Sequence, residues 1–107
     1  MTRIATIDAK TLAEEVKAAP IFLLDVREPN EAALCQIPGS VLIPLGHIAA
    51  RAAEVPDDQE VVVYCHHGRR SEMAIRMLQD AGLTRLRNLE GGIDAWAEAF
   101  DQEIARY

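Results

Sequence analysis

What this sequence lacks already excludes several classes of protein. It has only two cysteines, Cys35 and Cys65, which cannot make a disulfide framework, and a reducing compartment would keep both as thiols. No apolar run approaches the roughly 20 residues that a membrane-spanning helix needs. The first ten residues lack the charged and then apolar layout of a secretory signal. We therefore expect a cytoplasmic protein with no membrane partner.

Positive charge is also scarce. The sequence carries 17 acidic residues against 11 lysines and arginines, which gives a formal net charge of −6. Such a chain repels phosphate backbones, so we expect no nucleic-acid partner. The dense group of basic side chains at residues 66–70 therefore stands out, because an anion bound there must be attracted against the field of the whole molecule.

The length and composition predict one compact unit. The 107 residues are enough for a single hydrophobic core, and half of them are apolar. No repeat, low-complexity tract or linker divides the chain. We predict one domain over residues 1–107, present as a monomer or a homodimer.

Short apolar runs alternate with amphipathic stretches along the chain. Strands are expected at 3–7, 21–25, 41–44, 60–64 and 85–89, with helices after Asp8 and at 45–55, 71–81 and 93–100. Alternating strands and helices favour parallel pairing with right-handed crossovers. The predicted fold class is α/β, with three layers: a small, mainly parallel sheet of four to five strands flanked by helices.

Several side chains receive structural roles from their context. We expect Asp8 to cap the first helix, with Leu12, Val16 and Ala19 on its buried side. Cys35 has no cationic neighbour in the sequence and is interpreted as a buried filler. The same reasoning assigns to the core the following residues: Met73, Met77 and Trp96.

Residues 65–71, "CHHGRRS", lie between the strongest predicted strand and a predicted helix. Such a loop points several backbone N–H groups inward, and a helix N-terminus adds partial positive charge. Gly68 permits the positive φ of a tight curl, and Ser71 is suited to cap the helix. His66, His67, Arg69 and Arg70 add permanent or pH-dependent positive charge. A thiol at Cys65 would be held there as a thiolate nucleophile beside an anion cradle.

Four stretches resemble the single-domain rhodanese family of thiosulfate sulfurtransferases: "LLDVREPNE" (23–31), "IPGSVLIPLG" (37–46), "VVVYCHHGRRS" (61–71) and "NLEGGIDAW" (88–96). The resemblance implies the rhodanese fold and a persulfide on Cys65. Sulfur would come from a small anionic donor such as thiosulfate and pass to a thiol, cyanide or a protein acceptor. No metal or organic cofactor is implied.

The same resemblance implies roles around Cys65. Residues His66, His67, Gly68, Arg69, Arg70 and Ser71 would bind the substrate. Arg70 is the main candidate for contact with the bound oxyanion, and Arg69 the weaker one. Asp25, Arg27 and Glu90 match supporting positions, where an acid–arginine pair would brace the loops.

Three alternatives remain beside this reading. A persulfide-relay or protein-binding module serving a partner enzyme would use the same cysteine. A cysteine-based phosphatase or arsenate reductase is less favoured, because those phosphatases place Arg six positions after Cys, where this chain has Ser71. A zinc site is disfavoured, because adjacent histidines such as His66 and His67 are expected to project apart and no ordinary ligand spacing is present.

Overall fold

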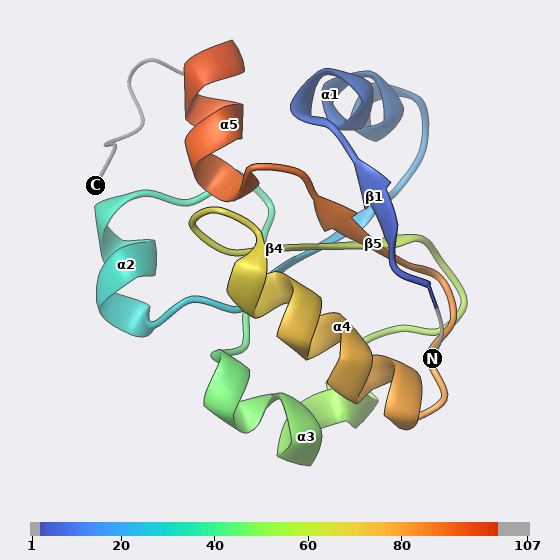
Figure 1. Ribbon diagram of the computed structural model, residues 1–107. Helices are drawn as coiled ribbons and strands as arrows, with labels where there is room; N and C mark the ends of the chain where they lie inside the picture. Colours follow the sequence, from blue (N-terminus) through green and yellow to red (C-terminus); the bar gives the residue numbers. More distant parts are fainter. Residues whose placement is uncertain (1–2, 101–107) are drawn as a thin grey trace.

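The computed structural model describes residues 3–100, and Figure 1 shows it as one sheet with helices on both faces. The strands are β1 (Ala5–Ile7), β2 (Phe22–Asp25), β3 (Val41–Leu42), β4 (Val61–Tyr64) and β5 (Leu86–Leu89). They lie in the order β1-β5-β4-β2-β3, and every neighbouring pair is parallel. The predicted α/β class and parallel sheet are confirmed, with five strands. Residues 1–2 and 101–107 of the predicted domain lie outside the described residues.

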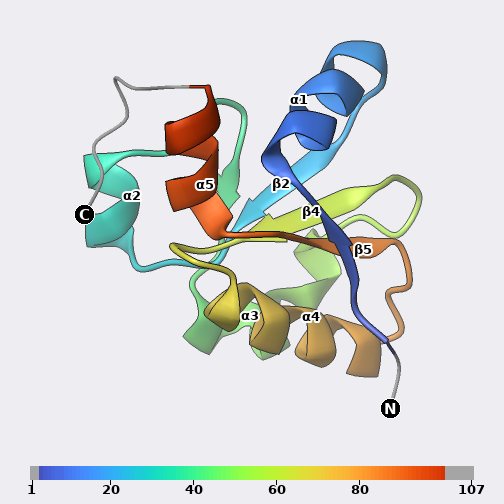
Figure 2. The same ribbon diagram turned by 45° about the horizontal axis from the view of Figure 1, so that its top comes forward.

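The helices cover the two faces of this sheet in pairs (Figures 1 and 2). Helices α1 (Ala9–Ala18) and α5 (Gly92–Ala99) pack on one face, while α3 (Ile48–Arg51) and α4 (Arg69–Asp80) pack on the other. Helix α2 (Pro29–Leu34) follows β2, and two 3₁₀ turns, η1 (Leu45–His47) and η2 (Ala52–Glu54), flank α3. No helix in residues 3–100 is long and apolar enough to span a membrane.

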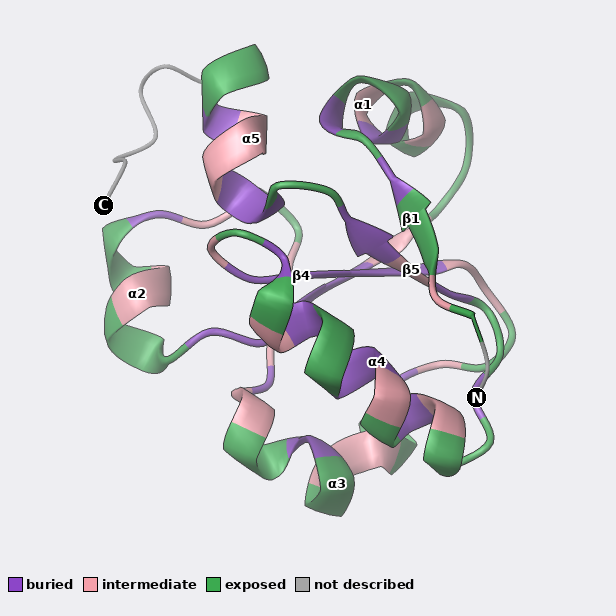
Figure 3. Cartoon of the chain, viewed as in Figure 1, coloured by how far each residue is buried: buried purple, intermediate pink, exposed green. Residues whose placement is uncertain are grey.

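Strand β4 is the centre of the sheet and is buried along its whole length, as Figure 3 shows. Val61 and Val63 join the core cluster beneath α3 and α4, whereas Val62 and Tyr64 join the cluster beneath α1 and α5. This unbroken apolar run needs no polar alternation because helices cover both faces of the sheet. The strand therefore delivers the residue after it, Cys65, to the carboxyl edge of the sheet at a fixed position.

The predicted first, third and last helices are found, but the one expected at 45–55 is divided into η1, α3 and η2, and some predicted buried faces are wrong. Asp8 caps α1 by accepting a hydrogen bond of 2.8 Å from the Thr11 backbone N–H. Leu12 is buried, but Val16 and Ala19 are exposed. Met73 and Met77 are also exposed, since α4 turns Ala74, Ile75 and Leu78 toward the sheet instead. Trp96 is half-buried against the second core cluster.

Candidate functional site

The carboxyl ends of β2 and β4 bring the predicted site residues to one edge of the sheet. Asp25 ends β2, and Cys65 directly follows β4. From Cys65 the chain curls through His66 and His67 to Gly68 and then enters α4. This is the edge at which parallel α/β sheets bind ligands.

The Cys65 sulfur is the centre of the curled loop. The backbone N–H of Gly68 donates a hydrogen bond of 3.0 Å to Cys65 Sγ. Gly68 has φ +112°, the left-handed conformation that the sequence predicted, and this lets its N–H point back at the sulfur. The hydroxyl of Ser71 lies 3.5 Å from the same sulfur. Cys65 is only 1% exposed, so a reactant must reach the sulfur through the mouth of the loop.

These contacts decide the acidity of the thiol. Burial pushes the pKa of Cys65 upward, but hydrogen bonds from the Ser71 side chain and from the backbone of Ser71, Gly68 and His67 outweigh it. The pKa of Cys65 therefore lies below its ordinary value. The loop thus stabilises a thiolate.

Ser71 does not cap α4, contrary to the sequence prediction. The helix begins at Arg69 with Gly68 as the N-cap residue, so Ser71 is the third residue of the helix. The positive φ of Gly68 turns the chain into the helix two residues early, and the N–H groups of that first turn face the Cys65 sulfur. The buried Ser71 hydroxyl is instead a contact of the thiol.

Asn88 is a site residue that the sequence analysis missed. It lies on β5, is buried, and accepts a hydrogen bond of 2.6 Å from the Ser71 hydroxyl. Its side-chain N–H₂ donates to the carbonyl of Gly68 at 3.0 Å. One side chain thus holds both Gly68 and Ser71 in place around the Cys65 sulfur. A polar side chain on the same strand face as the apolar core residues was the available signal, but Arg87 beside it made the strand look polar.

The first turn of α5 forms the opposite wall of the loop, which the sequence analysis also missed. The N–H of Ile93 donates to the Cys65 carbonyl at 2.9 Å, and that of Asp94 donates to the His66 carbonyl at 3.2 Å. Gly92 makes this approach possible: a Cβ added there would lie 2.3 Å from the His66 carbonyl oxygen and 2.4 Å from that of Cys65. The pair "GG" before the last helix was the signal in the sequence.

The two arginines of the loop have different surroundings. Arg70 is one-third exposed and forms a bidentate ion pair with Glu31 of α2, with N···O distances of 2.5 and 2.8 Å. Arg69 is exposed on the first turn of α4. Arg70, which was expected to contact a bound oxyanion, therefore already pairs with a carboxylate at the edge of the loop.

Asp25 and Arg27 form the expected acid–arginine brace. Both are 0% exposed, and two hydrogen bonds of 2.9 and 2.7 Å join the guanidinium to the carboxylate. Arg27 also donates to the Cys35 carbonyl at 2.7 Å, which ties the end of α2 to β2. Cys35 is buried as predicted, but a cation does lie beside it, because Arg27 Nη1 is 3.7 Å from its sulfur. Burial raises the pKa of the nearby Tyr64 phenol.

The structure places Glu90 apart from this brace. Its exposed carboxylate accepts a hydrogen bond of 2.9 Å from the Thr6 hydroxyl, which connects the end of β5 to β1. The arginine brace that the sequence assigned to Asp25, Arg27 and Glu90 is therefore made by the first two.

The histidines of the loop do not project apart, so the premise that disfavoured a metal is wrong. The rings of His66 and His67 stack, with centroids 4.0 Å apart and planes inclined by 25°. The tight curl before Gly68 is what turns two adjacent side chains to the same side. Burial, followed by the charge of His67, lowers the pKa of His66 below its ordinary value.

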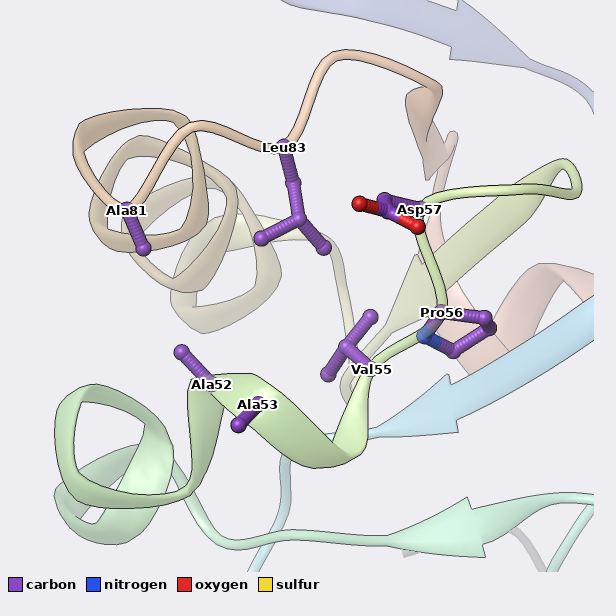
Figure 4. A pocket seen from close by; sticks show the side chains of 7 residues that line it. All are labelled: Ala52, Ala53, Val55, Pro56, Asp57, Ala81 and Leu83. Carbon is purple, nitrogen blue, oxygen red and sulfur yellow. The ribbon is translucent and has the colours of Figure 1, made fainter.

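A separate cavity of about 400 Å³ lies at the opposite edge of the sheet (Figure 4). Small and apolar side chains around η2 and the end of α4 line it, with one carboxylate: Ala52, Ala53, Val55, Pro56, Asp57, Ala81 and Leu83. None of these lining residues is a cysteine, histidine or arginine. Of the two places, only the Cys65 loop therefore carries a nucleophile and cations.

Comparisons with known proteins agree with this fold. The rhodanese-like domain profile matches residues 8–99. A sulfurtransferase of Allochromatium vinosum is 39% identical over 92 residues, which cover 85% of this chain and 86% of that protein. The thiosulfate sulfurtransferase GlpE of Pseudoalteromonas translucida is 31% identical over 98 residues, 92% of each chain. The putative sulfur carrier protein YrkF of Bacillus subtilis is 43% identical over 74 residues, 69% of this chain and 40% of that protein.

A solved structure shows the same architecture. The crystal structure of a rhodanese-related protein from Thermoplasma volcanium superimposes with a TM-score of 0.82 at 35% sequence identity. The match covers 90% of this chain and 93% of the other. The sheet and its flanking helices are therefore those of a known domain.

Proposed function

The chain belongs to the rhodanese-like domain family, and on that basis we propose that it transfers sulfane sulfur through a persulfide on Cys65. The donor is thiosulfate or a similar small anion, and the acceptor is a thiol, cyanide or a protein thiol. The family includes sulfurtransferases that match this chain over most of their length. We place the reaction in the cytosol, where both cysteines would stay reduced.

The observation that carries the proposal is the 3.0 Å hydrogen bond from the Gly68 N–H to Cys65 Sγ. A donor aimed at the sulfur stabilises negative charge there, first on the thiolate and then near the terminal sulfur of a persulfide. The same hydrogen bond is one of the contacts, after those of Ser71, that lower the pKa of Cys65. A cysteine that served only as core packing would have no need for such donors.

The chemistry is a double displacement that balances without a cofactor. The Cys65 thiolate attacks the outer sulfur of thiosulfate, the S–S bond of thiosulfate breaks, and sulfite leaves with the bonding electron pair. The product is a Cys65 persulfide anion. Cyanide or a thiolate then attacks the terminal sulfur, takes it as thiocyanate or as a new persulfide, and restores the Cys65 thiolate.

Positive charge at the edge of the loop favours an anionic donor. This charge comes from the loop residues His66, His67, Arg69 and Arg70. Arg70 is the best-placed cation because Glu31 holds its guanidinium at this edge. An arriving oxyanion would replace or share that carboxylate. We therefore expect Arg70→Ala to raise KM for thiosulfate, and Glu31→Gln to lower it, because the guanidinium is then available to the donor.

The burial of Cys65 limits what can react with it. Because the residue is 1% exposed, alkylation should be slowed, relative to free cysteine, much more for a bulky maleimide than for a small reagent such as iodoacetamide. An equal slowing for both reagents would show that the loop does not screen the sulfur.

The decisive experiment is an intact-mass measurement after incubation with excess thiosulfate. The wild type and Cys35→Ser should each gain one sulfur atom that cyanide removes, and Cys65→Ser should gain none. Circular dichroism would confirm that Cys65→Ser is folded. A sulfur gained by Cys65→Ser, or none gained by the wild type while Cys65 still alkylates, would overturn thiosulfate transfer through Cys65.

A relay function is the second candidate, favoured by the likeness to a putative sulfur carrier protein. In that case the acceptor is a thiol of a partner protein. A Cys65 persulfide that forms but turns over poorly with cyanide, and rapidly with a protein thiol, would identify the relay. Hydrolysis of phosphate monoesters or reduction of arsenate would instead support the less favoured phosphatase or arsenate reductase reading.

A further inference from the structure

Three metal-ligating side chains come together beside the Cys65 loop, and sulfur transfer uses none of them as nucleophile. His66, His67 and Asp94 each offer one nitrogen or oxygen, and these three atoms all lie within 4.8 Å of one another. His67 Nε2 is 3.8 Å from Asp94 Oδ2. The ligands come from two segments, the loop after β4 and the first turn of α5, which are 27 positions apart in the sequence (residues 67 and 94).

The backbone holds these two segments together. Asp94 N–H donates to the His66 carbonyl, and Ile93 N–H donates to the Cys65 carbonyl. Figure 1 shows the loop before α4 against the first turn of α5. Gly92 allows this close approach because any Cβ there would clash with both carbonyls. The carboxylate and the imidazoles are therefore placed by the fold, and do not meet by chance rotation of long side chains.

We propose that His66, His67 and Asp94 form a binding site for a divalent transition-metal ion, with Zn²⁺ as the best-fitting ion. Two imidazoles and one carboxylate suit Zn²⁺ and its neighbours, whereas Mg²⁺ and Ca²⁺ prefer ligand sets made of oxygen alone. Three protein ligands leave a fourth position for water or another exchangeable ligand. The proposal concerns this ion alone and does not depend on the sulfur chemistry of Cys65.

The site closes by a small movement of an exposed side chain. Ligand atoms of a tetrahedral zinc ion lie about 2.0 Å from the metal and so about 3.3 Å from one another. The present spacing of up to 4.8 Å is wider, and the two rings are stacked. His67 is 67% exposed and Asp94 25% exposed, so solvent gives the ion access and His67 has room to turn. His66 is more buried and serves as the fixed ligand.

Charges of both signs lie around the three ligands. The molecule carries a formal net charge of −6. The charged groups that act on His66 are His67 and Arg70 on the positive side and Asp94 and Glu31 on the negative side. Arg70 and Glu31 are paired with each other, and the Asp94 carboxylate adds negative charge beside both imidazoles. A bound ion would also join the Cys65 loop to α5.

The test is calorimetric titration of Zn²⁺ into the Cys65→Ser protein, so that the thiol cannot supply a ligand. His67→Asn and Asp94→Asn in this background should each weaken binding at least about tenfold, because each removes a direct ligand. His47→Asn is the matched control: it alters the one histidine of the chain outside the proposed site, which lies exposed in η1. Mg²⁺ titrated into the same protein should give no heat of binding.

A spectroscopic readout identifies the ligands independently. On Zn²⁺ addition, the ring signals of His66 and His67 should shift in an NMR spectrum of the histidine side chains, and those of His47 should not. The proposal is overturned if Cys65→Ser does not bind Zn²⁺, or if His67→Asn and Asp94→Asn bind as tightly as the His47→Asn control. Binding by the wild type alone would show that the thiol, and not this cluster, holds the ion. None of these results depends on sulfur transfer, so the two proposals fail separately.

Discussion

The Ser71 hydroxyl donates a hydrogen bond to the side-chain oxygen of Asn88. The Ser71 Oγ to Asn88 Oδ1 distance is 2.6 Å, and the orientation of the Asn88 amide is set by its N–H₂ group, which donates to the Gly68 carbonyl at 3.0 Å. In the thiol form, Cys65 can then donate its own proton to Ser71 Oγ, 3.5 Å away. When the thiol ionises, the Ser71 hydroxyl must turn toward the sulfur to stabilise it. Asn88 is thus a positioning residue for both Ser71 and the loop.

Asn88→Ala should weaken the loop. The change leaves the Gly68 carbonyl and the Ser71 hydroxyl without their partner, and each buried polar group left unpaired costs about 1–3 kcal/mol. We expect a lower free energy of unfolding and a slower rate of Cys65 persulfide formation, while KM for thiosulfate changes little. Asn30→Ala, on the exposed side of α2, is the control. If both variants behaved as the wild type does, the role given to Asn88 would be wrong.

Cys65 should ionise at a lower pH than an ordinary thiol. Burial raises its pKa, but hydrogen bonds from Ser71, Gly68 and His67 lower it by more than burial raises it. In Cys35→Ser protein, with a chelator present, alkylation by iodoacetamide should rise with pH and level off below the pH typical of free cysteine, about 8.5. Ser71→Ala should move the midpoint upward.

The same ionisation links stability to pH. Because the pKa of Cys65 is lower in the folded state than in the unfolded state, its deprotonation stabilises the fold above the ordinary thiol pKa. This contribution disappears as the pH falls through the lowered pKa. Urea denaturation at several pH values should show it in the wild type and not in Cys65→Ser. An unchanged pH dependence in Cys65→Ser would contradict the lowered pKa.

Gly92→Ala should damage the loop through a clash of atoms. The added Cβ would lie 2.3 Å from the His66 carbonyl and 2.4 Å from that of Cys65, so the loop or α5 must shift. We expect at least a tenfold loss of persulfide formation, by the general sensitivity of reaction rates to displacements of about 1 Å. The matched control is Gly82→Ala, which has φ +99° but nothing within 4 Å of the added Cβ. It should lose roughly 1 kcal/mol of stability from backbone strain and keep its activity.

Arg27→Met should be strongly destabilising. It leaves the Asp25 carboxylate, which is 0% exposed, without its cation, and breaking a buried ion pair in this way costs about 3–5 kcal/mol. Urea denaturation measures the change. Arg51→Met, which removes an exposed ion pair with Glu54, is the control and should have little effect. Equal effects of the two changes would show that the Asp25–Arg27 pair does not brace the fold.

The sequence predicted correctly those features that are set by contacts between residues close together in the chain. The apolar run before Cys65 predicts a covered strand, and Gly68 has the positive φ that its place in the loop requires. Asp8 caps its helix through a residue three positions away, which is a purely local contact. The faces of helices were less certain: Val16 and Met73 fit a helical stripe of apolar residues, yet no neighbouring element covers them.

The sequence by itself determined the order of strands and helices, the parallel sheet and the Cys65 loop, because hydrophobic periodicity and glycine conformation act over a few residues. Only the tertiary structure decided which distant groups complete that loop. Asn88 on Ser71, Glu31 on Arg70 and Asp94 beside His67 come from three other segments of the chain. The physical reason is that β-sheet pairing and helix packing, not sequence spacing, set these distances.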